Sequence, residues 1–164
     1  MGNKPAVLVS ACLLGRNCKY NGGSNLDGRV AALADVCRLI PVCPEEDGGM
    51  RTPRLPSEIS GGRVVNKAGE DVTAAFKAGA GKTLLKAREN GCLLAVLKER
   101  SPSCGSGRIY DGTFTGALTE GDGVTAALLK RHGIAVFGES EIEKVTERLR
   151  PFMQPVQPED DLSG

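Results

Sequence analysis

The chain is poor in aromatic residues and carries almost no net charge. Phe, Tyr and Trp make up 4% of its 164 residues, Trp is absent, and 21 Lys and Arg stand against 20 Asp and Glu. Duplex-binding surfaces need clustered cations, and single-stranded nucleic acid rests on aromatic side chains. The composition provides neither, so we expect a small-molecule site and no nucleic-acid partner.

Long apolar runs are also missing. No segment approaches the roughly 20 apolar residues of a membrane span, and the run 6–9 is shorter than the roughly 7 to 15 residues of a secretory signal core. We therefore expect a soluble, cytoplasmic protein with no membrane partner and one domain over residues 1–153. The tail, 154–164, has little to bury and is expected to be disordered. A monomer and a small homo-oligomer both stay open.

Histidine occurs once, at His132, just before Gly133 at the expected end of a helix. A protonated imidazole there is favoured by the negative end of the helix dipole. A Ser-His-Asp or Cys-His machinery would rest on this residue alone, so we favour a capping role. The glycine-rich stretches lack the Walker and dinucleotide patterns, and no phosphate site is assigned to them.

Short apolar runs alternate with amphipathic segments, which indicates an α/β fold. Strands are predicted at 6–11, 39–43, 92–97 and 134–137, and a small hairpin at 110–115. Helices are predicted at 28–39, 71–90 with an interruption near 79–81, 124–131 and 139–149. This order predicts a small, open, mostly parallel Rossmann-like sheet flanked by helices. A long irregular loop, 45–62, follows the second strand, and such segments are usually functional.

Three of the six cysteines follow predicted strands. Cys12 and Cys43 stand at strand ends, and Cys104 lies in the loop after the most apolar strand. Because the downstream ends of parallel strands share one edge, these thiols are expected to converge. No two cysteines form a CxxC pair, so the chain is unlike common zinc ribbons and fingers. Thiolates suit zinc, copper(I) and iron–sulfur clusters, and we predict a metal or cluster site.

The other three cysteines are placed differently. Cys92 begins its strand at the opposite edge and Cys37 lies on an apolar helix face, so both are predicted to be small core residues. Cys18, in a polar loop, is a fourth ligand, a mobile gate or an exposed thiol. If only three thiolates hold a cubane cluster, one iron keeps an open position, and an open position is the arrangement of a catalyst.

Groups suited to proton transfer flank two of the cysteines. Glu45 lies two residues after Cys43, and Ser101 and Ser103 precede Cys104. A carboxylate near an open metal site acts as a general base if it lies within hydrogen-bond reach of the attacking oxygen. The alternative is that Glu45 is an ordinary solvent-exposed acid of the loop, like its neighbours Glu46 and Asp47.

Four motifs in this order resemble the DUF523 family, and the resemblance extends to about Leu149. They are Ser10-Ala11-Cys12-Leu13-Leu14-Gly15, Cys43-Pro44-Glu45, Asp71-Val72-Thr73 and Lys98-Glu99-Arg100-Ser101-Pro102-Ser103-Cys104-Gly105. The resemblance implies an oxygen-sensitive [4Fe-4S] cluster as cofactor, with Cys12, Cys43 and Cys104 as its ligands. It also implies that Glu45 and Ser101 form the catalytic pair.

The activity that the resemblance implies is that of a thiouracil desulfidase. Such an enzyme replaces the thiocarbonyl sulfur of a thiolated pyrimidine, such as 2-thiouracil, by oxygen in a non-redox hydrolysis, giving uracil and hydrosulfide. On this hypothesis Glu45 deprotonates water, Ser101 and Ser103 contact the substrate, and Arg54 orients it. Whether the natural substrate is a free thiobase, a thionucleoside or another compound stays open.

Two other classes of protein also fit the residues. One is a zinc or iron–sulfur sensor without turnover, in which Cys18 joins the other three cysteines in a closed four-ligand site. The other is a thiol enzyme whose single low-pKa cysteine attacks an electrophile. Metal content separates the first from a cluster enzyme, and activity after removal of iron separates the second.

Overall fold

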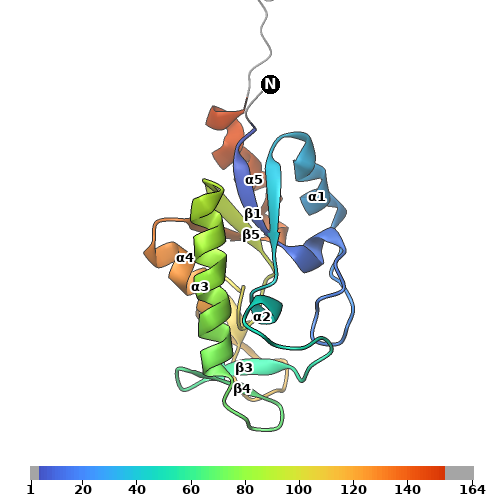
Figure 1. The fold of residues 1–164 in the computed structure, drawn as a ribbon, viewed down its shortest axis with the longest axis vertical. Coiled ribbons are helices and arrows are strands. Elements are labelled where there is room, and N and C mark those ends of the chain that lie inside the picture. The colour runs from blue at the N-terminus through green and yellow to red at the C-terminus, as the bar shows by residue number, and fades with distance from the viewer. Residues whose placement is uncertain (1–3, 154–164) are drawn as a thin grey trace, which may run out of the picture.

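Four parallel strands form the central sheet, in the order β2-β1-β5-β8 (Figure 1). The structure is a computed structural model and describes residues 4–153. The strands are β1 (Ala6–Ser10), β2 (Arg38–Val42), β5 (Leu94–Leu97) and β8 (Ala135–Gly138). The predicted parallel sheet is confirmed, and each strand begins and ends within about two residues of its predicted limits. The tail predicted to be disordered, 154–164, lies outside the described residues.

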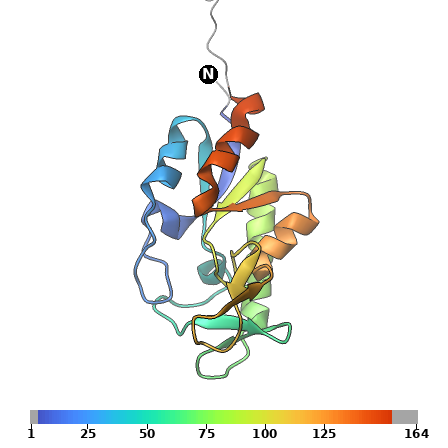
Figure 2. The same ribbon diagram turned by 180° about the vertical axis from the view of Figure 1, so that it is seen from behind.

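Helices cover both faces of this sheet (Figures 1 and 2). One face carries α3 (Thr73–Glu89) and α4 (Val124–Arg131), and the other carries α1 (Gly28–Ala31) and α5 (Ile142–Leu149). Alternate residues of β1 point to the two sides, so Leu8 joins one core while Val7 and Val9 join the other. Both faces of the sheet are buried, which explains why its two central strands, β1 and β5, are almost entirely apolar.

The first predicted helix is shorter than expected. The sequence predicts a helix over 28–39, but α1 ends at Ala31 and tightens into a 3-10 turn, η2 (Ala32–Asp35). The reason is the strand that follows, because Arg38 must pair beside Ala6. Asp27 caps α1, because its side chain accepts the backbone N–H groups of Arg29 and Val30. Among the described residues, no helix has both the length and the apolar character needed to cross a bilayer.

His132 is the C-cap of α4, and its ring nitrogen Nδ1 lies 2.8 Å from the guanidinium of Arg88 on α3. The predicted position at a helix end is therefore confirmed. The last helical region, predicted at 139–149, opens as a 3-10 turn, η3 (Glu139–Glu141), before α5 begins at Ile142 and ends at Leu149. A further 3-10 turn, η4 (Arg150–Phe152), follows α5.

The segment 45–62 follows the second strand as predicted, and its middle, 48–56, contains no helix or strand, but its two ends are regular. A short helix, α2 (Pro44–Asp47), follows Cys43, and β3 (Ser57–Ser60) forms an antiparallel hairpin with β4 (Arg63–Asn66). The hairpin alone lacks the apolar alternation of a half-buried strand, which is why the sequence pattern misses it. It lies below the ends of the central strands in Figure 1.

The hairpin that the sequence predicts at 110–115 exists but is larger than expected. Its strands are β6 (Arg108–Tyr110) and β7 (Leu118–Glu120), and the predicted range 110–115 falls mostly in the connecting loop. Asp111 begins this loop, and its side chain accepts the N–H of Thr113. Local side-chain hydrogen bonds of this kind favour a turn over a strand.

The helix α3 runs without a break through Gly79 and Gly81, where the sequence predicts an interruption. Gly79 is needed for packing, because a Cβ there would lie 1.8 Å from the carbonyl oxygen of Pro44. The missing side chain lets α2 lie directly against α3. This contact fixes the segment that follows Cys43.

We predict opposite effects for two alanine substitutions in α3. Gly79→Ala forces α2 away from α3 and lowers the free energy of unfolding by about 1–3 kcal/mol. Gly81 has no atom within 4 Å of the position of a Cβ, so Gly81→Ala raises the free energy of unfolding by up to about 1 kcal/mol through helix propensity. Urea unfolding measures both, and a Gly79→Ala protein as stable as the Gly81→Ala protein would contradict the packing argument.

Candidate active site

A cavity of about 530 Å³ opens at the downstream edge of the sheet. Its walls come from the ends of the central strands, from α2 and from the hairpins β3–β4 and β6–β7. Four cysteines line it: Cys12, Cys18, Cys43 and Cys104. The structure thus brings together the three strand-end cysteines that the sequence singles out, and adds a fourth.

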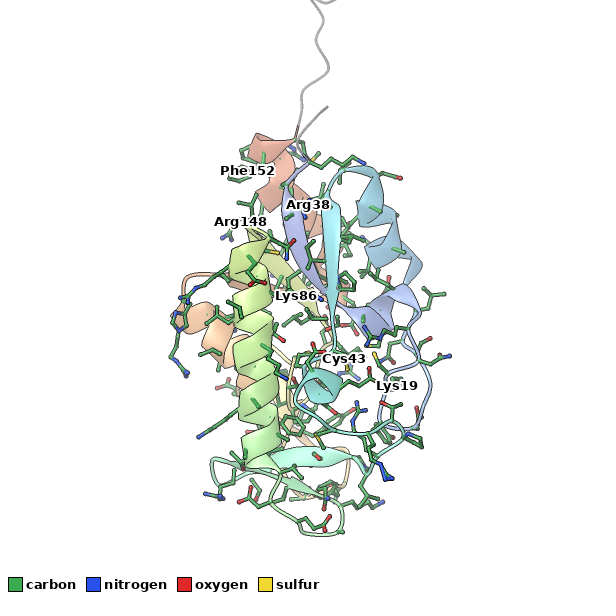
Figure 3. The ribbon with its side chains drawn as sticks, in the orientation of Figure 1. Lys19, Arg38, Cys43, Lys86, Arg148 and Phe152 are labelled. Atoms are coloured by element: carbon green, nitrogen blue, oxygen red, sulfur yellow. The ribbon has the colours of Figure 1, made fainter. Side chains whose placement is uncertain are left out.

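Each strand-end cysteine is held by the backbone that follows its strand. Cys12 lies in a 3-10 turn, η1 (Ala11–Leu14), directly after β1, and Cys43 is the N-cap of α2. Figure 3 shows Cys43 at the lower end of β2 beside α2, with Arg38 at the other end of the same strand. Cys104 follows β5 after a tight turn. The three thiols therefore rest on a rigid sheet edge.

Cys37 and Cys92 do not line the cavity. Cys37 is 2% exposed within the core under α1, which confirms its predicted role, and Cys92 is half-buried just before β5. Burial raises the pKa of both thiols to about 11. Neither is activated for chemistry.

Cys18 is buried and lies beside Cys12 and Cys43, so the alternative of an exposed thiol is wrong. Its polar loop folds inward because hydrogen bonds satisfy the buried backbone. Arg54 Nη2 donates to the carbonyl oxygen of Cys18 at 2.8 Å, and the N–H of Asn25 donates to that of Cys12 at 2.9 Å. One ligand atom each of Cys18, Cys43 and Glu46 lies within 4.8 Å of the others.

The Cys18 thiol polarises its neighbours. Its hydrogen bond to Cys12 raises its own pKa and is the largest cause that lowers the pKa of Cys12 to about 7, with Asn25 and Lys98 adding to the effect. A hydrogen bond from Cys18 also lowers the pKa of Cys43. Burial raises the pKa of Cys104 to about 12.

Glu45 contributes a carboxylate to the cavity wall, with 17% of its side chain exposed. Arg54 Nε donates to Glu45 Oε1 at 2.8 Å, and the remaining Arg54 groups bond to Arg51, Thr52 and Cys18. Within residues 4–153 the other oxygen, Oε2, has no hydrogen-bond partner. Arg54 therefore ties Glu45 to the loop that carries Cys18.

Ser101 and Ser103 both hold the turn that carries Cys104. Ser101 Oγ accepts the N–H groups of Ser103 and Cys104, each at 3.0 Å, which leaves its own proton free to donate. Ser103 is 1% exposed, and its hydroxyl lies 3.1 Å from that of Thr125 at the start of α4. The Cys104 loop is thus fastened to itself and to α4.

Several residues of the cavity were missed by the sequence analysis. They are Ser10, Lys19, Asn25, Glu58, Lys67, Tyr110 and Phe114. Ser10 stands in the first of the four motifs that resemble the family, so that motif could have identified it, whereas Tyr110 lies outside all four. Glu58 had no such signal, because its partners lie 54 and 56 residues further along the chain.

We predict that Ser101 stabilises the Cys104 turn. Ser101→Ala leaves two backbone N–H groups without their acceptor and lowers the free energy of unfolding by about 1–2 kcal/mol. Ser101→Asn supplies a side-chain oxygen of similar reach and recovers most of that loss. Urea unfolding of the three proteins is the measurement, and equal stability of wild type and Ser101→Ala would show that the turn holds without this cap.

The fold and the site together define a class. The chain is a parallel α/β protein whose sheet edge carries a cavity lined by four thiols and an arginine-held carboxylate. The model of the 2-thiouracil desulfurase family matches residues 7–141, and the chain belongs to this family. The resemblance predicted from its motifs is confirmed.

Two relatives cover nearly the whole chain. The uncharacterized protein YbbK of Bacillus subtilis (strain 168) is 45% identical over 149 residues, covering 85% of this chain and 99% of YbbK. A solved structure described as a [4Fe-4S]-dependent thiouracil desulfidase, TudS (DUF523Vcz), is 45% identical with a TM-score of 0.85. That match covers 90% of this chain and 99% of the other. The fold of this protein is therefore that of TudS.

Proposed function

We propose that this protein is a [4Fe-4S]-dependent desulfidase that removes the thiocarbonyl sulfur of a thiolated pyrimidine such as 2-thiouracil. The reaction is a non-redox hydrolysis that gives uracil and hydrosulfide. The observation that supports it is the meeting of three strand-end cysteines and Glu45 around one cavity, in a chain 45% identical to a solved desulfidase. The closed sensor site and the thiol enzyme have no comparable support.

The donor set fits a cluster better than a single ion. Among the described residues, the group of three or more ligand atoms close enough to share one ion is Cys18, Cys43 and Glu46, and it leaves out Cys12 and Cys104. The ligands of a cubane bind separate irons and stand farther apart than the ligands of one ion. We therefore assign Cys12, Cys43 and Cys104 as ligands. When bound, the cluster would supply a Lewis-acidic iron with an open position for the thiocarbonyl sulfur.

Cys18 is assigned a supporting role. Its S–H lies beside two of the ligand sulfurs and donates to them, and such hydrogen bonds tune the thiolates of a cluster. This assignment keeps one coordination position free of protein sulfur. A closed four-ligand site would lose that position.

Three residues of the chain have separate roles in the hydrolysis. Glu45 Oε2 takes a proton from water, whose oxygen forms a bond to the ring carbon while the carbon–sulfur bond breaks. Both pairs of the C=S bond end on sulfur, which takes the proton held by Glu45 and leaves as hydrosulfide. The new hydroxyl on the ring carbon loses its proton to solvent and becomes the carbonyl, so no oxidant or reductant is required. Ser101 donates its free proton to the substrate as charge develops, an effect that reaches about 3 kcal/mol in a dry site. Arg54 holds Glu45 in place.

The contacts of Arg54 and Ser103 favour positioning over direct contact with the substrate. The donor groups of Arg54 reach the protein itself, and the Ser103 hydroxyl is paired with Thr125. The sequence-based roles of these two residues in substrate binding stay predictions. So do a cytoplasmic location, the absence of a nucleic-acid partner and a monomeric or small homo-oligomeric state.

Removal of single cysteines should separate ligands from neighbours. After anaerobic purification, we expect Cys12→Ala, Cys43→Ala and Cys104→Ala to lose most iron and sulfide, because each removes a ligand. Cys18→Ala should keep most of both, and the control Cys92→Ala should match wild type. Iron and sulfide analysis with visible absorption is the measurement. If Cys18→Ala loses iron as fully as Cys104→Ala, the site is closed by four cysteines.

Replacement of Glu45 tests the general base. Glu45→Gln keeps the shape of the side chain but cannot take a proton, so kcat for 2-thiouracil should fall about 10²–10⁴-fold with the iron content unchanged. The control is Asp47→Asn, at the end of α2 and outside the cavity lining, which should retain the wild-type rate. If Glu45→Gln turns over 2-thiouracil at nearly the wild-type rate, Glu45 is not the general base.

A further inference from the structure

A second carboxylate faces the cavity from the β3–β4 hairpin. Glu58 is 8% exposed, and its Oε1 accepts the N–H groups of Gly112 at 2.9 Å and Phe114 at 3.1 Å. Its Oε2 has no hydrogen-bond partner within residues 4–153. That oxygen is not sealed in the protein, because the enclosed side-chain atoms without a partner there are Ser57 Oγ and Thr83 Oγ1. Glu58 lines the cavity, so its Oε2 is available to a guest.

The two backbone hydrogen bonds also hold a strained loop against β3. Phe114 has a φ of 56°, a left-handed conformation that costs a non-glycine residue on the order of 1–2 kcal/mol. Gly112 approaches so closely that a Cβ would lie 2.7 Å from the carbonyl oxygen of Ile59. Phe114 and Tyr110 line the same cavity as Glu58. The Glu58 carboxylate thus holds the loop that carries Phe114, and its second oxygen lies in the same cavity wall.

We propose that Glu58 Oε2 accepts a hydrogen bond from the ring N–H between the thiocarbonyl and the carbonyl carbon of the substrate. The inference rests on the proposed function and names the edge of the ring that the site selects. A carboxylate offers only acceptors, so it favours a ring with a donor at this position. 2-Thiouracil carries a hydrogen on that nitrogen, whereas 2-thiocytosine presents a bare nitrogen. Glu58 therefore selects uracil-type over cytosine-type rings.

The substitution Glu58→Gln reverses the hydrogen-bonding character of one atom. The N–H groups of Gly112 and Phe114 require an acceptor, so they hold the new amide oxygen at the Oε1 position. The amide NH₂ is then directed to the Oε2 position, where it is a donor. An acceptor that faces the substrate becomes a donor without loss of the loop contacts.

The test compares kcat/KM for 2-thiouracil and 2-thiocytosine, at a pH below the ionisation of either ring. Glu58→Gln should lower kcat/KM for 2-thiouracil roughly 10–100-fold, the loss expected for one charge-assisted hydrogen bond. The value for 2-thiocytosine should stay constant or rise, so the ratio of the two changes at least about tenfold. Glu58→Ala should lower both, because it releases the loop that holds Phe114.

Two controls separate recognition from folding and from cluster loss. Glu120→Gln makes the same chemical change at an exposed position on β7, outside the cavity lining, and should leave both substrates unaffected. Iron content and thermal unfolding are measured for every variant. Calorimetry with uracil and cytosine measures binding independently of turnover. Glu58→Gln should weaken the binding of uracil relative to that of cytosine.

The outcomes distinguish the two proposals. Suppose that wild type desulfurates 2-thiouracil and that Glu58→Gln lowers kcat/KM for both substrates by the same factor. Glu58 then only holds the loop, and the inference is overturned. Suppose instead that the iron-loaded wild type turns over neither substrate, but binds uracil more tightly than cytosine and loses this preference in Glu58→Gln. The proposed function then fails while the inference stands. Uracil and cytosine binding that Glu58→Gln leaves unchanged overturns the inference whatever the turnover.

Discussion

The parallel register of the central strands is the constraint on which the site depends. Ser10 at the end of β1 pairs beside Val42 at the end of β2, and Val9 pairs beside Val96 of β5. The residues that follow these ends therefore lie side by side, although they are far apart in the sequence. Because both faces of the sheet are buried, this edge cannot shift without disturbing two cores. Sites built on such elements hold their groups more precisely than sites built on loops alone.

Close backbone contacts at two glycines then position the segments that carry the cysteines. At Gly79 the backbone of α3 touches α2, which follows Cys43. At Gly123 a Cβ would lie 2.5 Å from the carbonyl carbon of Ser103, next to Cys104. In both cases a helix presents a glycine to the turn that follows a strand. The absence of side chains at these two positions therefore determines the geometry of the cavity as much as the thiols do.

The sequence predicts the sheet and its functional edge because both follow from local patterns. Strands buried on both faces are continuous apolar runs, and the residues that end such runs are easily recognised. The burial of Cys18 was not predictable in this way, since it depends on Arg54 reaching its carbonyl from 36 residues along the chain. The pairing of Ser103 with Thr125 is likewise long-range. Residues placed by distant hydrogen bonds, such as Glu58, leave no periodic signal.

Glu45 and Glu58, two of the three glutamates that line the cavity, are held in the same way. Each binds the protein through a single oxygen, Glu45 through the guanidinium of Arg54 and Glu58 through two backbone N–H groups, and each keeps its second oxygen free. The bonded oxygen fixes the orientation of the group, so the free one is held ready for a guest without further ordering. This is why replacing either acid by its amide tests chemistry and leaves the shape of the cavity largely unchanged.

Charge in the cavity must balance for such acids to lie near thiolates. Arg54 and Lys98 supply the compensation, because Lys98 helps to lower the pKa of Cys12 and Arg54 that of Cys43. Each of these cations is itself paired with a carboxylate, Lys98 with Glu139 and Arg54 with Glu45. The acids thus hold the two cations in place, and the cations favour the ionised form of the thiols. Carboxylates and thiolates can lie close together here because cations stand between them. The lining as a whole holds the cations Lys19, Arg54, Lys67 and Lys98 beside the acids Glu45, Glu58 and Glu99, so the acids and the thiols share the cavity wall with cations.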